Sequence, residues 1–119
     1  MEKKILVMEK DENVLDIIIM LLKEEGYTAK GLTSEKDFFD EIDKFKPNAI
    51  LLDVVTPSDI GLKLCEDIKQ HPKHGSIPII VLSTHYKAER AKEVCASEVV
   101  NKPFDIDELI ETVNKQLVA

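Results

Sequence analysis

The chain has 119 residues, enough for one domain that buries about 65% of the surface its unfolded form would expose. Its net charge of -7 argues against a nucleic acid or an anionic membrane surface as partner, because phosphate contacts need clustered Lys and Arg. No apolar run approaches the ~20 residues of a bilayer span, and the one after residues 1–4 is too short for a signal-peptide core. We therefore expect one cytoplasmic domain over residues 1–119.

The first half of the chain alternates an apolar run with an amphipathic segment. Residues 5–8 are continuously apolar, which is typical of a parallel strand buried on both faces. Asp11 then predicts the N-cap of a helix that Gly26 ends. Residues 27–32 predict a weak edge strand, and Ser34 predicts the start of a second helix. The positions expected to face inward on these two helices are Val14, Ile17, Ile18, Leu21 and Leu22, then Phe38, Ile42 and Phe45.

The second half repeats this alternation more strongly. Residues 49–52 predict a central buried strand that ends on Asp53. A helix over 60–70 and a strand over 77–82 that ends on Ser83 are predicted next, followed by a short helix over 87–95 and a strand at Val99–Val100. The last predicted helix starts at Asp105 and Glu108. Its inward positions are Ile106, Leu109, Ile110, Val113 and Leu117. Five such strand–helix units predict a three-layer α/β sandwich with a parallel sheet.

The cysteines and histidines suggest no metal site. Cys65 and Cys95 are too few for a disulfide framework, so we expect both to be reduced and to pack as small hydrophobic residues. His71 and His74 stand in a predicted loop around Pro72, and we expect a surface position for them.

Polar side chains follow the apolar runs where the predicted strands end. In open α/β sheets, ligands bind beyond the carboxyl ends of the strands. The residues expected at this edge are Glu9 and Lys10, Asp53, Ser83 and Lys102. Two carboxylates, two ammonium groups and a hydroxyl should therefore converge. The sequence has no Gly-rich phosphate loop, so a dinucleotide or triphosphate cofactor is not expected.

Three stretches in this order carry a family resemblance: residues 51–57 (LLDVVTP) with Gly61, residues 79–83 (IIVLS), and residues 101–104 (NKPF). Together they make the whole chain resemble the response-regulator receiver domain (CheY-like) of two-component phosphorelay systems. The resemblance implies a flavodoxin-like fold, with a five-stranded parallel sheet of order 2-1-3-4-5 and five helices.

The resemblance also implies roles for individual residues. Asp53 would be the phosphoacceptor, which takes a phosphoryl group from a histidine kinase or a phosphotransfer protein. Ser83, Thr84 and Lys102 would bind the phosphoryl oxygens, and the Lys102–Pro103 peptide bond would be cis. Any enzymatic activity would be limited to self-catalysed phosphoryl transfer to Asp53 and its hydrolysis.

The acidic pair that usually holds Mg²⁺ is not intact. The resemblance implies metal ligation by Glu9, Asp53 and the carbonyl of Val55, but Lys10 stands where the second acid is expected. The usual site has three carboxylates and one lysine, whereas this one has two carboxylates balanced by Lys10 and Lys102. We therefore predict that Mg²⁺ binding is weak or absent, and that the Lys10 ammonium replaces the metal.

The output side also departs from the family. Ser83 and Val99 stand at the two switch positions, and Val99 replaces the aromatic residue that many receivers have there. The resemblance implies a downstream protein partner on the surface of the fourth helix, fifth strand and fifth helix. No output domain accompanies the receiver sequence, so we expect output through protein–protein contact.

Two functions from different classes fit these residues. The first is a signalling receiver that is phosphorylated on Asp53. The second is a pseudo-receiver, an interaction module that needs neither metal nor phosphorylation. A flavin mononucleotide carrier fits less well, because stacking aromatic residues and a phosphate loop are missing.

Overall fold

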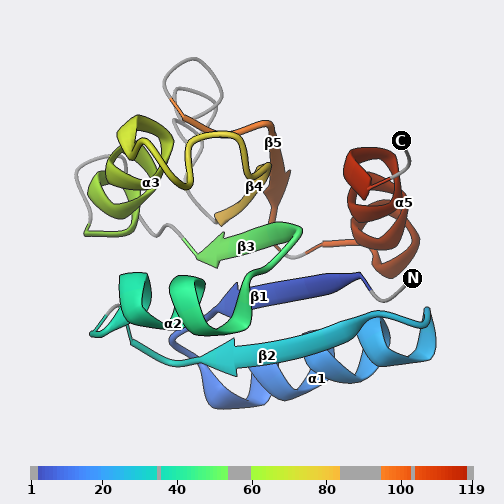
Figure 1. Cartoon of the computed structure of the whole chain (residues 1–119). Helices are drawn as coiled ribbons and strands as arrows, with labels where there is room; N and C mark the ends of the chain where they lie inside the picture. The colour runs from blue at the N-terminus through green and yellow to red at the C-terminus, as the bar shows by residue number, and fades with distance from the viewer. Residues whose placement is uncertain (1–2, 35, 54–59, 84–94, 103, 118–119) are drawn as a thin grey trace.

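The computed structural model describes residues 3–34, 36–53, 60–83, 95–102 and 104–117. Its five strands form one parallel sheet of order β2-β1-β3-β4-β5, as predicted (Figure 1). The strands are β1 (Lys4–Met8), β2 (Thr28–Leu32), β3 (Ala49–Asp53), β4 (Ile79–Ser83) and β5 (Glu98–Asn101). The prediction that β3 ends on Asp53 is confirmed.

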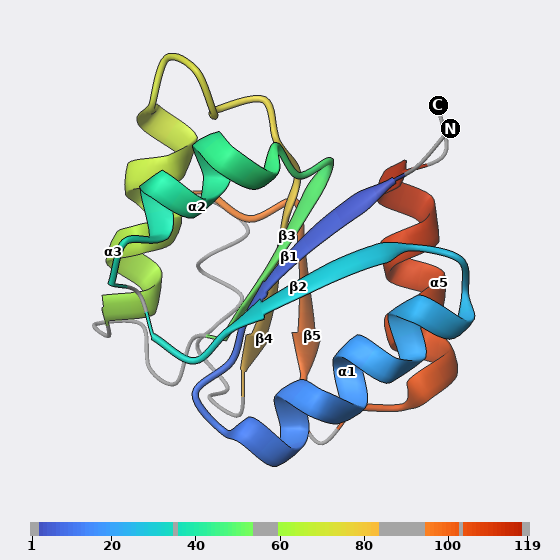
Figure 2. The same ribbon diagram turned by 60° about the horizontal axis from the view of Figure 1, so that its bottom comes forward.

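Helices cover both faces of this sheet. They are α1 (Glu12–Glu24), α2 (Phe38–Phe45), α3 (Ile60–Gln70) and α5 (Ile106–Leu117). Figures 1 and 2 show α1 and α5 on one face and α2 and α3 on the other, which confirms the three-layer sandwich. The helix predicted over 87–95 lies outside the described residues except for Cys95. Among the described helices, none is long and apolar enough to cross a bilayer.

The side chains of alternate strand residues pack in two apolar clusters, one between the sheet and each pair of helices. Successive side chains of a strand point to opposite faces, so β1 sends Leu6 to one cluster and Val7 to the other. We call the first cluster the α2–α3 core; its members include Met8, Phe38, Ile42, Ile50, Leu52, Leu64, Ile68 and Val81. The second, the α1–α5 core, includes Ile5, Leu15, Ile18, Leu22, Leu51, Leu82, Leu109 and Val113.

The predicted helix boundaries hold for α1 and α5 but not for α2. Asp11 caps α1 by accepting hydrogen bonds from the backbone N–H groups of Asn13 and Val14, at 2.9 and 3.3 Å. Gly26 follows with φ of 94°, the left-handed conformation that favours glycine. By contrast, α2 begins at Phe38 and not at Ser34, whose hydroxyl instead accepts a hydrogen bond from the backbone of Lys36 in the preceding turn.

The inward face of α1 is turned by about one residue from the predicted stripe. Ile18 and Leu22 of the predicted stripe are buried, and Val14 packs partly buried against the α1–α5 core. Leu15 is buried as well, whereas Ile17 is 48% exposed. Ile106, expected to be buried on α5, is 50% exposed. A helix with apolar residues on more than one face has no unique inward direction in its sequence, and here packing against the sheet selects it.

The expectation of two reduced cysteines is wrong for this structure. Cys65 of α3 and Cys95 form a disulfide, with their Cα atoms 5.8 Å apart and 30 positions between them in sequence. Both side chains are buried in the α2–α3 core, more deeply than the half-burial expected of them. The sequence did not show the pairing, because disulfide geometry depends on how the fold places the two Cα atoms.

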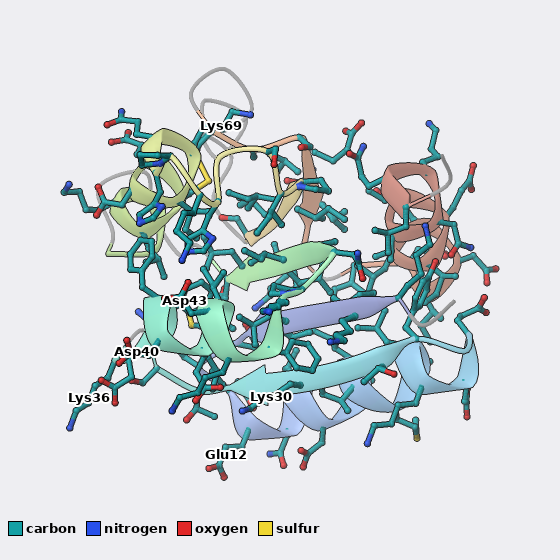
Figure 3. The ribbon with its side chains drawn as sticks, in the orientation of Figure 1. Glu12, Lys30, Lys36, Asp40, Asp43 and Lys69 are labelled. Atoms are coloured by element: carbon teal, nitrogen blue, oxygen red, sulfur yellow. A yellow bond between two sulfur atoms is a disulfide. The ribbon has the colours of Figure 1, made fainter. Side chains whose placement is uncertain are left out.

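The surface position expected for the two histidines is wrong for His74, which is buried. Its ring stacks on that of His71, with centroids 4.4 Å apart, and its Nε2 lies 3.2 Å from Oδ1 of Asp43. Asp43 points from α2 toward the α3 side (Figure 3). Within the described residues, no group of three or more His, Cys, Asp or Glu side chains could hold a metal ion.

Candidate functional site

Four strands deliver polar residues to one edge of the sheet. Met8 is in register with Leu52 and Ser83 with Asn101, so Glu9, Asp53, Ser83 and Lys102 all lie at or just beyond the carboxyl ends of their strands. Because the sheet is parallel, these ends share one edge. The structure thus brings these four residues to the predicted edge, while Lys10 is exposed just beyond β1.

The ammonium group of Lys102 bridges the two carboxylates. Its Nζ donates to Oε1 of Glu9 at 2.5 Å and to Oδ1 of Asp53 at 3.1 Å. The Glu9 side chain is 1% exposed, that of Asp53 is 6% exposed and that of Lys102 is 16% exposed. These are charge-assisted hydrogen bonds in a region of low water access, so they are stronger than surface ion pairs.

Backbone hydrogen bonds fix the chain on either side of this bridge. The N–H of Glu9 donates to the carbonyl of Leu32 at 2.9 Å, which continues the pairing of β1 with β2. The N–H of Lys102 donates to the carbonyl of Ser83 at 2.7 Å, which continues the pairing of β5 with β4. The fully buried Ser83 therefore lies beside the backbone from which the lysine side chain projects.

Burial and charge act in opposite directions on the ionisable groups here. Burial, together with the neighbouring carboxylate of Asp53, raises the pKa of Glu9 to about 7, although the hydrogen bond from Lys102 opposes this. Burial disfavours the ammonium of Lys102, but its bonds to Glu9 and Asp53 outweigh that effect and raise its pKa. Two carboxylates thus share one ammonium.

One oxygen of Glu9 is free to hold a further ligand. Its Oε2 is buried and has no hydrogen-bond partner in the part of the chain that the structure describes. A buried acceptor without a partner is costly, and carboxylate oxygens are the ligands that Mg²⁺ prefers. Glu9 and Asp53 therefore fit a magnesium site of two carboxylates completed by water, but both of them already contact the Lys102 ammonium.

The other residues predicted for the site are Lys10, Val99, Val55 and Thr84. Lys10 is exposed just beyond β1, and the ammonium placed between the two carboxylates is that of Lys102. Val99 lies in β5 in register with Val81 and packs against the α2–α3 core. The predicted ligands Val55 and Thr84, and the predicted cis bond to Pro103, lie outside the described residues.

Sequence reasoning did not anticipate that Lys102 would contact Glu9 as well as Asp53. The family resemblance pointed Lys102 toward a phosphoryl group, and the charge balance pointed Lys10 toward the acids. The available signal was the position of Lys102 after β5, at the same edge as both carboxylates. That Lys10 replaces the metal stays a prediction.

Comparisons with known proteins agree with this geometry. Residues 5–114 match the family described as response regulator receiver domain. The chain is 32% identical to the regulatory protein VanR of Enterococcus faecium. The match covers 98% of the present chain and about half (51%) of VanR. A solved response-regulator structure from Chloroflexus aurantiacus is 28% identical, with a TM-score of 0.89 and 98% of both chains covered.

A third likeness concerns the fold. The chemotaxis protein CheY4 of Vibrio cholerae is 21% identical and superposes with a TM-score of 0.86 over 98% of this chain and all of its own. The family match, the VanR relative and the similar solved structures agree with one another. The chain therefore belongs to the response regulator receiver domains of two-component signalling.

Proposed function

We propose that this receiver accepts a phosphoryl group on Asp53 and signals by protein–protein contact. Receiver domains interact with histidine kinases or phosphotransfer proteins, and one of these would be the donor. The observation that carries the proposal is the carboxylate of Asp53, held at the buried end of β3 within 3.1 Å of the Lys102 ammonium. A nucleophile and a cation so placed suit phosphoryl transfer, which depends mainly on positioning and charge neutralisation.

In the proposed transfer, Asp53 is the nucleophile and Lys102 neutralises charge. A carboxylate oxygen of Asp53 attacks the phosphorus of a phosphohistidine, the P–N bond breaks, and the histidine leaves with its electron pair and takes up a proton. The Lys102 ammonium exchanges its hydrogen bond to a carboxylate oxygen for one to a phosphoryl oxygen. The hydroxyl of Ser83, on the neighbouring strand, donates a hydrogen bond to a second phosphoryl oxygen. Mg²⁺, which receiver domains usually bind, would supply further positive charge at Glu9 and Asp53.

The experiment is labelling with acetyl phosphate, read by intact-protein mass spectrometry. The unmodified chain should gain the mass of one phosphoryl group, and Asp53→Asn should gain none. Asp16→Asn, a change of the same kind on the exposed side of α1, should label like the unmodified chain. Equal labelling of Asp53→Asn would refute Asp53 as the acceptor.

A second candidate is the pseudo-receiver. It is favoured by the charge balance, because Lys10 and Lys102 together offset Glu9 and Asp53 without a metal ion. If neither acetyl phosphate nor beryllofluoride modifies the chain at any Mg²⁺ concentration, this candidate replaces the first. In both cases we propose a partner on the surface of β5 and α5, together with the predicted fourth helix that lies outside the described residues.

A further inference from the structure

The fold brings together the two cysteines of the chain, although 30 positions separate them. Cys65 lies on α3, and Cys95 lies three positions before β5. Their Cα atoms are 5.8 Å apart, within the range that a disulfide spans without moving the backbone. The pair is unrelated to the Asp53 site and has no part in the proposed phosphoryl transfer.

The surroundings of the pair suit both the bonded and the reduced form. Cys65 is fully buried and Cys95 is nearly so, among the apolar side chains of the α2–α3 core. A reduced cysteine packs as a small hydrophobic residue, so this core can hold two thiols without leaving a polar group unsatisfied. Opening the bond would therefore remove a covalent link without requiring the core to unfold.

The bond links α3 to the segment that leads into the amino end of β5. The helix α3 follows β3, which ends on Asp53, and the segment from Cys95 leads into β5, which Lys102 follows. The backbone N–H of Ser97 donates to the carbonyl of Ile79 at 2.8 Å, so pairing with β4 begins two residues after the disulfide. In Figure 1 the segment that leads into β5 passes beside α3.

We propose that Cys65 and Cys95 are a reversible redox pair, whose disulfide restrains β5 when closed and releases it when open. The oxidant is a small-molecule disulfide such as oxidised glutathione. When the segment before β5 opens locally, the Cys95 thiolate attacks oxidised glutathione and expels a glutathione thiolate, and the Cys65 thiolate then attacks the mixed disulfide and expels the other. Two protons leave the cysteines and two electrons pass to glutathione. The reverse sequence opens the bond.

The redox equilibrium is tested on the native chain in buffers with varied ratios of reduced to oxidised glutathione. After acid quenching and alkylation, mass spectrometry counts the free thiols. We expect a reversible change from two alkyl groups to none as the buffer becomes more oxidising. A bond that stays closed in reduced glutathione, or thiols that stay free in oxidised glutathione, would overturn the proposal.

The restraint on β5 is tested by amide hydrogen exchange of the same two forms. Amides over Glu98–Asn101 should exchange severalfold more slowly in the oxidised form, whereas those of β2, at the far edge of the sheet, should exchange alike. The variant C65A/C95A should show one exchange rate in both buffers. Equal β5 rates in the oxidised and reduced native chain would remove the regulatory role. Because neither measurement uses Asp53, both stand even if phosphorylation is absent.

Discussion

Glu9 carries the least favourable charge in the described part of the site. Its pKa is raised from 4.5 to about 7 by burial and by Asp53, so the folded chain binds a proton that the unfolded chain has already released. Between these two values the folded state is favoured at the lower pH. Stability should therefore fall as pH rises from about 4.5 to about 7, by at most roughly 3 kcal/mol.

Replacing Glu9 by glutamine should remove most of this pH dependence. The unmodified chain should lose stability between pH 5 and pH 8, and Glu9→Gln should lose about 1–3 kcal/mol less over the same interval, because its amide stays neutral. Urea unfolding at the two pH values measures the difference. The exposed Glu24→Gln should behave like the unmodified chain. Identical pH slopes for the Glu9 variant and the unmodified chain would contradict the buried, proton-binding carboxyl.

We predict that Lys10 weakens the affinity of the site for Mg²⁺. Lys10→Asp changes the local charge by two units and restores the second acid, so we expect Mg²⁺ to bind at least tenfold more tightly and acetyl phosphate to label faster. Isothermal titration with Mg²⁺ and a labelling time course measure the two effects. Lys69→Asp makes the same charge change at the far end of α3 and should do neither. Tight Mg²⁺ binding by the unmodified chain would show that Lys10 does not weaken the site.

The residues of the site could be foreseen from sequence, but not their pairing. Glu9, Asp53, Ser83 and Lys102 each follow an apolar run, and a parallel sheet places such positions on one edge. Which ammonium reaches which carboxylate depends on side-chain direction across the edge, which spacing does not encode. The same holds for Cys65 and Cys95, whose contact depends on how α3 packs.

At the scale of elements, Asp11 serves as the N-cap of helix α1. It directly follows Lys10 in sequence, and its Oδ1 accepts two backbone hydrogen bonds from the first turn. Capping residues of this kind contribute about 1 kcal/mol. The sequence indicated this role correctly, because Asp directly before an amphipathic segment favours an N-cap.

Removing this cap should weaken the fold and leave metal binding unchanged. We expect Asp11→Ala to lower the free energy of unfolding by about 1 kcal/mol, and Asp11→Asn by clearly less because its amide oxygen can still accept. Urea unfolding measures both, and Mg²⁺ titration should give the same affinity for all three chains. A loss of Mg²⁺ affinity in Asp11→Ala, with stability unchanged, would assign Asp11 to the site instead.

The sequence predicted the position of some elements better than that of others. The strands were predicted well, because continuous apolar runs leave few alternatives for a sheet buried on both faces. The start of α2 was not, since Ser34 forms a local turn and Asp37 adopts a left-handed conformation with φ of 60° before Phe38. The inward face of α1 was displaced because Ile17 and Leu15 are equally apolar, and packing decides between them.

At the scale of the whole molecule, the site joins the two halves of the sheet. Glu9 is bound to β2 through Leu32, and Lys102 is bound to β4 through Ser83, so the Lys102 bridge connects the β2 side with the β5 side. A phosphoryl group on Asp53 would draw Lys102 away from Glu9. The β5 side would then change its contacts, while the backbone pairing of β1 with β2 would remain.

This asymmetry gives the last prediction, which concerns where the signal appears. Beryllofluoride with Mg²⁺ should alter amide hydrogen exchange mainly in β4, β5 and the start of α5, and little in α1 and β2, because Lys102 lies next to the first group. Asp53→Asn, treated alike, should show no change. Val99 packs on the α2–α3 side of β5 and carries no aromatic ring, so we expect Val99→Tyr to enlarge this change. A response confined to α1 and β2 would place the output on the opposite side of the domain.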